Sequence, residues 1–234
     1  MLRTVVLHYH LFKNAGTTLD SIFKKNLGDS WVTTEFPMAG DNNTSLVEEW
    51  IRGTPDARAY SAHTMVGPLP QVGGVRIVPV MLLRDPISRI KSAYNFERNQ
   101  LSESWGAKLA KAGSFQNYVE TRLAQPGDRQ CRNFHAHRLA SIVPGPEPEL
   151  HRAMTGLSVI AAQGVVGAVE KFDETIARLS ARLGPDFPTL TWDETRKNVS
   201  KKNDAQDNLQ LMQVLVDANR ADLDLHSQVL KGFQ

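Results

Sequence analysis

Apolar runs typical of buried strands alternate with segments of helical periodicity along this chain. Residues 4–11 and 75–83 are mostly apolar, as expected for strands covered on both faces. Shorter apolar segments at 58–62 and 165–169 predict two further strands, the second of them in a central position. Because helices separate these strands, we expect an α/β fold of three layers, α/β/α, with a central parallel sheet.

Helices are predicted where helical periodicity lies between recognisable start and stop signals. Asp85 and Pro86 form a strong start, because Asp caps the free N–H groups of a first turn and Pro fits the first helical position. Gly28 and the pair Gly184-Pro185 end the helices that precede them. Pro79 argues against a central position for the first half of its strand, since it has no N–H to donate. Outside 100–155, the expected helices are 17–27, 45–52, 86–99, 173–183 and 205–230.

The length of the chain, 234 residues, suits one domain with a full hydrophobic core. Its content of 41% hydrophobic and 22% charged residues is ordinary for a globular protein. We expect a single domain over 1–234, into which a helix-rich region at about 100–155 is inserted. A Pro-Gly-Pro sequence at 144–146 breaks that region.

Charge and cysteine content narrow the function classes. The net charge of +2 is compatible with an anionic ligand and is too weak to indicate nucleic-acid binding. Cys131 is the single cysteine, so an intrachain disulfide is excluded. We find no signal peptide and no apolar stretch of membrane-spanning length, so we expect a cytoplasmic protein of bacterial type with no membrane partner. The sequence leaves the oligomeric state open.

The loop after the first strand has the residues of a phosphate-binding site. Lys13 supplies a cation, and Gly16 allows a ligand to approach the backbone closely. Backbone N–H groups and hydroxyls come from Asn14, Ala15, Gly16, Thr17 and Thr18. The loop differs from a Walker P-loop, in which the Lys follows the second Gly, because Lys13 precedes Gly16. An ordinary strand-to-helix turn with Thr at the helix start explains this loop equally well when it is taken alone.

A second candidate anion site follows the strand at 75–83. Arg84 stands at the strand end, and Ser92 lies two turns into the next helix, on the face of Asp85. An Arg and a hydroxyl at this spacing can bind one phosphate, the Arg through two parallel hydrogen bonds. The alternative is a surface ion pair beside a polar helix face. In parallel sheets of this kind ligands bind beyond the carboxyl ends of the strands, where both loops are expected.

Together the two loops resemble the signature elements of sulfotransferases that use 3′-phosphoadenosine 5′-phosphosulfate (PAPS). The matching stretches are Lys-x-x-Gly-Thr-Thr from Lys13 and Leu-Arg-Asp-Pro-x-x-Arg-x-x-Ser-x-Tyr from Leu83. The chain is most similar to the branch that contains heparan sulfate and uronyl 2-O-sulfotransferases and their bacterial relatives. This resemblance implies a fold like that of P-loop NTPases, PAPS as co-substrate and no required metal.

The resemblance implies roles for the residues of the two loops. The first loop, Lys13 to Thr18, would bind the 5′-phosphosulfate, and Lys13 would also stabilise the leaving phosphate. Arg84 and Ser92 would bind the 3′-phosphate. In the basic segment 196–203, Ser200 and Lys202 would close over the same phosphate, although a solvated loop is an equally simple interpretation.

The resemblance also implies a catalytic base. The segment Ala-Tyr-Ser-Ala-His at 59–63 is similar to the Tyr-His-Gly-His segment of the family, so His63 would be the general base. Ser61 stands where the family has its first histidine. The segment Val-Gly-x-x-Glu at 166–170 resembles a family strand that lies beside the nucleotide.

Further histidines and cations have simpler interpretations. His8 and His10 share one face of the first strand, where we expect packing or support of the loop rather than metal binding. His135 and His137 face apart on a helix. The middle region also concentrates cationic side chains, which would form either a rim for an anionic acceptor sugar or a solvated helix face: Arg122, Arg129, Arg132, His135 and Arg138.

The function expected from the sequence is sulfuryl transfer from PAPS to a hydroxyl group of a carbohydrate or small metabolite. A nucleotide kinase or NTPase is one alternative, disfavoured by the position of Lys13 and by the use of Asp85 as a helix cap instead of a Mg²⁺ ligand. A sulfotransferase-like module that binds nucleotide or glycan without turnover is another, because the first histidine is missing. The acceptor is not predicted, since segments 31–57 and 100–155 match the family least.

Overall fold

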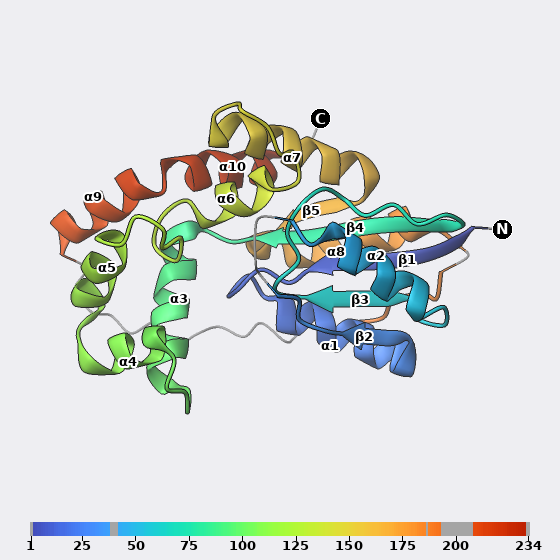
Figure 1. Cartoon of the computed structure of the whole chain (residues 1–234), viewed down its shortest axis with the longest axis horizontal. Coiled ribbons are helices and arrows are strands. Elements are labelled where there is room, and N and C mark those ends of the chain that lie inside the picture. The colour runs from blue at the N-terminus through green and yellow to red at the C-terminus, as the bar shows by residue number, and fades with distance from the viewer. Residues whose placement is uncertain (1, 38–41, 186, 193–207, 233–234) are drawn as a thin grey trace.

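The computed structural model describes residues 2–37, 42–185, 187–192 and 208–232. These form a parallel sheet with helices on both faces and a group of further helices beyond the carboxyl ends of the strands (Figure 1). The predicted three-layer α/β/α fold is therefore confirmed. None of the helices in these ranges is long and apolar enough to cross a membrane.

The sheet has five strands in the order β2-β3-β1-β4-β5, and all neighbouring pairs are parallel. The strands are β1 (Arg3–Tyr9), β2 (Trp31–Thr33), β3 (Ala59–Ala62), β4 (Val75–Leu83) and β5 (Val165–Ala168). Three were predicted within two residues at either end and β5 within one, whereas the three-residue strand β2 was missed. The central position predicted for β5 is wrong, because it pairs with β4 alone and lies at an edge of the sheet.

The first half of β4, up to Pro79, pairs with β1 alone and so lies at an edge of the sheet, as the sequence predicted. The N–H of Arg3 donates to the carbonyl of Gly74, and successive residues of a strand face opposite neighbours, so Pro79 faces β5. The pairing of β5 begins opposite Val80, one residue further on. Gly164 lies against Pro79 at this point, and a Cβ on Gly164 would come within 1.9 Å of the Pro79 carbonyl oxygen. Pro79, which donates no hydrogen bond, and Gly164, which has no Cβ, together allow β5 to begin close beside β4.

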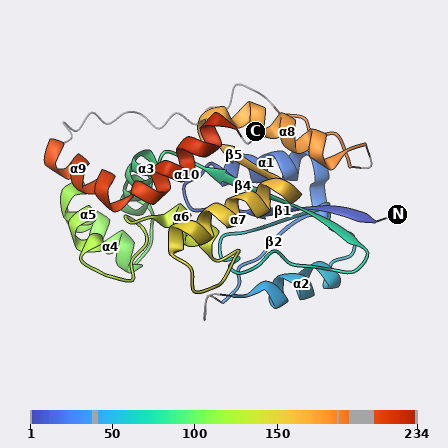
Figure 2. The same cartoon turned by 90° about the horizontal axis from the view of Figure 1, so that it is seen from above.

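Two helices cover one face of the sheet, and four cover the other (Figure 2). Leu19 and Phe23 of one helix pack with Leu179 of the second over the first face. Ile51, Leu139 and similar apolar side chains fill the core on the second face. The first pair is α1 (Gly16–Leu27) and α8 (Phe172–Leu183), and the other four are α2 (Thr44–Gly53), α6 (Phe134–Ala140), α7 (Glu149–Gln163) and α10 (Arg220–Lys231).

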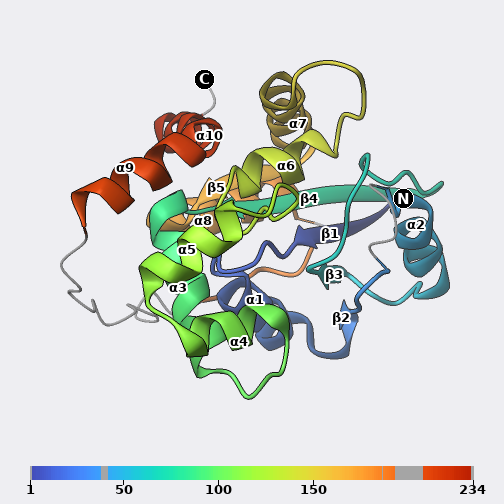
Figure 3. The ribbon, with the colours of Figure 1, turned by 60° about the vertical axis from the view of Figure 1, so that its left-hand side comes forward.

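A separate apolar cluster lies beyond the carboxyl ends of the strands (Figure 3). It is formed by α3 (Pro86–Asn99), α4 (Trp105–Ala112), α5 (Phe115–Leu123) and α9 (Leu209–Ala218). Ile90 and Tyr118 lie at its centre and are fully buried. The cluster confirms a helix-rich middle region and places it next to the end of the sheet where ligands bind in such folds. Two short 3-10 turns, Gly28–Ser30 and Val169–Lys171, complete the described elements.

The single C-terminal helix predicted over 205–230 is wrong, because the described part consists of two helices that meet at Asn219. The side chain of Asn219 is fully buried. Its Nδ2 donates to the carbonyls of Cys131 and Leu215, and its Oδ1 accepts from the N–H of Asn133. These bonds to a distant loop favour the break, and local periodicity gives no sign of them.

Candidate functional site

The loop between β1 and α1 has a strained backbone. Lys13 and Ala15 have φ values of 64° and 58°, in the left-handed region that residues with a Cβ seldom adopt. Such conformations persist only where the surrounding structure enforces them, and they cluster at functional sites. Their effect here is to turn the chain sharply into the first turn of α1, with Ala15 as the N-cap residue.

The start of α1 offers free backbone donors. Among the described residues, the N–H groups of Ala15, Gly16 and Thr17 have no hydrogen-bond acceptor, and no side chain caps the helix. Thr18 donates its N–H to the Ala15 carbonyl within the turn. Free N–H groups at a helix start, together with the helix dipole, favour an anion. The side chain of Thr17 is exposed and that of Thr18 is half-buried, so the Thr17 hydroxyl is open to solvent.

Asn14 supports the loop from within. Its side chain is buried, where Nδ2 donates to the Phe12 carbonyl and Oδ1 lies 2.9 Å from Nε2 of His135. Its N–H donates to the carbonyl of Leu11. Asn14 was predicted to offer its N–H to the ligand, but the structure uses that group to hold the turn.

Two cations, Lys13 and Arg84, lie side by side at the carboxyl edge of the sheet. Nη1 of Arg84 lies 3.4 Å from the carbonyl oxygen of Lys13 and donates to it. Burial lowers the pKa of Lys13, and the charge of Arg84 lowers it further. Nζ of Lys13 lies 4.4 Å from the centre of the Phe96 ring. Within the described residues neither cation forms an ion pair with a carboxylate, so an anion bound between them would relieve their repulsion.

The carboxylates near Arg84 are occupied by structural contacts. Asp85 caps α3 by accepting from the N–H of Ser88 at 2.7 Å, as predicted. Glu170 accepts from the N–H of Asp85 and from Nε2 of His226. Burial alone would raise the pKa of Glu170, but these hydrogen bonds outweigh it and lower the pKa to about 2. The end of the 166–170 segment is thereby fixed beside the start of α3, and its predicted place beside a nucleotide stays a prediction.

Of the remaining residues predicted for the 3′-phosphate, the structure describes Ser92 alone. Ser92 is half-buried in the second turn of α3, the helix that begins directly after Arg84 and Asp85. Ser200 and Lys202, with the rest of segment 196–203, lie outside the described residues. Their assignment stays a prediction.

His63 follows β3 and lies close to the loop between β1 and α1, although about fifty residues separate the two in the sequence. Its ring stacks on the ring of His10, with a centroid distance of 3.9 Å and an angle of 30° between the planes. Nδ1 lies 2.6 Å from Oε1 of Glu35, and the side chain is 47% exposed. Arg138 donates to the His63 carbonyl at 2.7 Å. This contact with Glu35 keeps the hydrogen on Nδ1 and leaves Nε2 as the proton acceptor.

Sequence reasoning missed Glu35. It belongs to a polar stretch with no motif, and its approach to His63 depends on the pairing of β2 with β3. Thr33 of β2 pairs with Ser61 of β3. Glu35 follows Thr33 by two residues and His63 follows Ser61 by two, so this pairing brings the two side chains together. The hydrogen bonds from His63 outweigh the effect of burial and lower the pKa of Glu35, which keeps this carboxyl group ionised.

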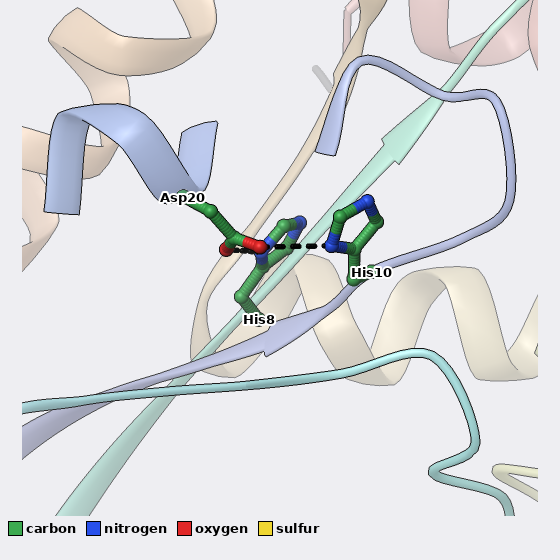
Figure 4. Close-up of side chains that lie close together, drawn as sticks. All are labelled: His8, His10 and Asp20. Atoms are coloured by element: carbon green, nitrogen blue, oxygen red, sulfur yellow. Dashed lines mark hydrogen bonds and ion pairs between the residues drawn. The ribbon is translucent and has the colours of Figure 1, made fainter. Parts of the chain in front are cut away.

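His8, His10 and Asp20 form a compact group on the face of the sheet that α1 covers (Figure 4). Each imidazole Nδ1 lies 2.8 Å from a different oxygen of the Asp20 carboxylate. Hydrogen bonds from both rings outweigh the effect of burial and hold the pKa of Asp20 far below its usual range. Burial lowers the pKa of His8. One nitrogen of each ring and one Asp20 oxygen lie within 4.8 Å of one another, the spacing of a metal site, and imidazole-to-carboxylate hydrogen bonds account for these contacts.

Ser61 lies below this group. Its side chain is fully buried, and Oγ lies 3.0 Å from Nδ1 of His8. It therefore supports the His8–Asp20 pair from inside the sheet. From this buried position, Ser61 cannot take the role of an exposed imidazole beside His63.

Comparison with known proteins gives the chain a family. A protein of Archaeoglobus fulgidus described as an uncharacterized protein is 35% identical to it over 205 residues, which span 85% of this chain and 81% of that protein. The chain belongs to the family of this archaeal protein. No protein-family model matches the chain, and no solved structure does.

In this family member, the cations of the middle region are buried or half-buried, and each has a partner within the protein. Arg122 is buried between the carboxylates of Glu97 and Asp128, and Arg129 pairs with Glu149. Arg132 donates to the Leu123 carbonyl, His135 is buried against Asp222, and Arg138 holds the His63 segment. These contacts argue against a freely solvated helix face, and a rim for an anionic acceptor stays a prediction. They fasten the helices to one another and to the site.

Proposed function

We propose that the protein is a PAPS-dependent sulfotransferase that transfers a sulfuryl group to an acceptor hydroxyl. The observation that carries the proposal is the convergence of three sequence-distant segments: the strained loop with free donors at Ala15 to Thr17, the cation pair Lys13 and Arg84, and His63. The two loops are also those that resemble the signature elements of this enzyme class.

The donor side of the proposal rests on electrostatics. Free N–H groups at the start of α1 would bind the 5′-phosphosulfate, and Lys13 would stabilise charge on the bridging oxygen as it leaves. Arg84 would bind the 3′-phosphate, with Ser92 on the adjoining helix as a second donor. PAPS carries both groups, which accounts for two cations at the same edge of the sheet.

The acceptor side of the proposal rests on His63. Its Nε2 would take the proton of the acceptor hydroxyl while the acceptor oxygen forms its bond to sulfur. The bond between sulfur and the bridging phosphate oxygen breaks in the same in-line displacement, which leaves 3′-phosphoadenosine 5′-phosphate (PAP) as the product. Glu35 would stabilise the imidazolium that forms. An acceptor hydroxyl on a carbohydrate or small metabolite suits this open, half-exposed base.

The structure favours this proposal over a nucleotide kinase or NTPase. Those enzymes hold Mg²⁺ through a carboxylate near the phosphates. Of the two carboxylates beside Arg84, Asp85 caps α3 and Glu170 bonds His226 and the Asp85 N–H. Both are committed to holding the fold.

Nucleotide preference tests the proposal. We expect PAP to raise the melting temperature of the protein more than ATP with Mg²⁺ does. In Arg84→Ala, binding of PAP measured by calorimetry should weaken about 10- to 100-fold, the loss of one charge-assisted hydrogen-bonding group. Binding of AMP, which has no 3′-phosphate, should change less.

Arg52→Ala is the matched control, since Arg52 is an exposed Arg on α2 that pairs with Glu48, and it should bind PAP as the wild type does. Stabilisation by ATP with Mg²⁺ and not by PAP would overturn the proposal. An equal loss of PAP and AMP binding in Arg84→Ala would contradict the role given to Arg84.

A further inference from the structure

His10 occupies the position between the proposed base and the proposed donor site. Its ring stacks on His63 on one side, and the ring of His8 lies on the other with a centroid distance of 5.1 Å. It follows directly after β1, where its N–H donates to the carbonyl of Ala62 at the end of β3. The pairing of β1 with β3 therefore fixes His10 and His63 relative to each other.

Asp20 fixes the orientation of the His10 ring. Oδ2 of Asp20 lies 2.8 Å from Nδ1 of His10, and the low pKa of Asp20 keeps it an acceptor. Nδ1 must then carry a hydrogen, and the opposite nitrogen, Nε2, is directed away from Asp20. We find no hydrogen-bond partner for this Nε2 in the described part of the chain.

The free edge of the His10 ring lies against the start of α1. A Cβ on Gly16 would come within 2.1 Å of Cδ2 and 2.4 Å of Nε2 of His10. This close approach explains why residue 16 must be Gly. It also places Nε2 beside the free N–H groups of Ala15, Gly16 and Thr17, where the anion is proposed to bind.

We propose that His10, oriented by Asp20, is a second catalytic histidine that contacts the sulfuryl group during transfer. The inference rests on the proposed sulfotransferase function. Protonated His10 would donate Nε2–H to a sulfuryl oxygen while His63 accepts the proton of the acceptor hydroxyl. Each of the two imidazoles contacts a carboxylate, His63 that of Glu35 and His10 that of Asp20, which His8 also contacts, so positive charge on each ring would have a negative neighbour.

This arrangement compensates for the histidine that Ser61 replaces in the segment before His63. A second imidazole reaches the site from the neighbouring strand. His8 does not share the role, because its side chain is buried and its Nε2 is closed off from solvent.

Two isosteric substitutions separate a ligand contact from a structural role. The amide nitrogen of Gln can replace Nε2 of His, whereas the amide of Asn lies near the position of Nδ1 and cannot reach as far. We expect His10→Asn to lower kcat about 10²- to 10³-fold, as removal of one transition-state donor does. His10→Gln should retain at least about tenfold more activity than His10→Asn. Release of PAP from PAPS with a panel of uronic-acid glycans and hydroxylated metabolites measures both.

PAP binding and thermal melting complete the test. PAP has no sulfuryl group, so both variants should bind PAP within about threefold of the wild type and melt close to it. His151→Gln, the same substitution at an exposed histidine on α7, should leave kcat and PAP binding unchanged. A parallel loss of PAP binding and melting temperature in both variants would show that His10 only holds the fold together, and would overturn the inference.

Four further outcomes would also count against it. Unchanged kcat in both variants would remove His10 from the reaction while leaving the sulfotransferase proposal intact. Greater activity in His10→Asn than in His10→Gln would assign the role of His10 to its Asp20 contact instead of its free edge. Loss of wild-type activity on chelation, with recovery on addition of Zn²⁺, would make His8, His10 and Asp20 a metal site. A wild-type protein that neither binds PAP nor uses PAPS would overturn the proposed function, and this inference with it.

Discussion

At the residue scale, His63 combines an accessible side chain with a fixed ring orientation. Its side chain is half-exposed, so an acceptor can reach it, yet its ring is held on two sides by Glu35 and His10. The contact with Glu35 settles which nitrogen carries the hydrogen, and the stacking on His10 settles the plane of the ring. A general base needs both a free nitrogen and a fixed direction.

Replacement of His63 by Ala tests this role directly. We expect His63→Ala to lower kcat by about 10²- to 10⁴-fold, the usual contribution of a general base. PAP binding should persist, because His63 contacts no group proposed to hold the nucleotide. His137→Ala, at a histidine on α6 paired with Glu149, is the control and should retain full transfer. Unaltered turnover in His63→Ala would exclude this residue as the base.

At the scale of elements, the sheet depends on a close contact between two backbones. β4 carries Pro79 in its interior, and β5 reaches it only through Gly164, where any side chain would collide with the Pro79 carbonyl. Gly164, which has no Cβ, thus fixes the end of α7, the turn after it and the start of β5. Arg84 follows β4 and Glu170 follows β5, so both residues lie just beyond the two strands that this contact joins.

We therefore expect Gly164→Ala to destabilise the protein. The added methyl group would lie 1.9 Å from a backbone oxygen, which cannot move aside as a flexible side chain can. A loss of about 1–3 kcal/mol in the free energy of unfolding is the usual cost of such overpacking, measurable by urea denaturation. Gly53→Ala, at the end of α2 with nothing near its Cβ position, should change it by less than about 0.5 kcal/mol. Equal effects of the two substitutions would refute this account of the β4–β5 contact.

At the scale of the whole molecule, polar contacts join the sheet to the helical cluster beyond it. Glu170, after the edge strand, bonds both the start of α3 and His226 of α10. His135 of α6 lies between Asn14 in the first loop and Asp222 of α10. The C-terminal helix is thereby connected to both loops that are proposed to bind the anion, although it contributes no residue to the proposed chemistry.

The Glu170 contact predicts a pH dependence of stability. The pKa of Glu170 falls from its ordinary value of 4.5 to about 2 on folding, so its contribution is fully present above pH 4.5. That contribution is lost as the pH falls from 4.5 towards 2. Glu170→Gln should therefore melt below the wild type at pH 7, and the two melting temperatures should converge over this acidic window.

Glu103→Gln provides the comparison, since Glu103 is an exposed residue whose contact is with Lys108. It should melt like the wild type throughout the same range. A difference between Glu170→Gln and the wild type that stays constant down to pH 2 would contradict the assigned contact.

Local signals in the sequence were enough for most of the elements. The start of α3 at Asp85 and Pro86 and the end of α1 at Gly28 follow from the chemistry of those residues alone. The edge position of β5 and the break at Asn219 did not follow, because each depends on a partner far away in the sequence. Periodicity records which face is apolar, and it does not record which strand lies next to which.

The same distinction separates the predicted from the unpredicted parts of the site. Lys13, Arg84 and His63 each belong to a recognisable motif, and strand order brings them to one edge. Glu35 and Asp20 have no motif, because an acidic residue in a polar loop or on a helix is common. Their importance arises only when β2 pairs with β3 and α1 packs on the sheet.

The single large residue of β3, Tyr60, stands among small ones, which has a consequence for folding accuracy. Ser61 fits beneath Asp20 and His8, whereas its neighbour Tyr60 points to the opposite face and packs on Trp50. A slip of one residue between β1 and β3 would drive the Tyr60 ring into the space that Ser61 fills, and would turn His63 away from His10. Misaligned molecules would thus be strained and would lack the proposed site, so the specific activity expected of a transferase would report the fraction of chains that paired correctly.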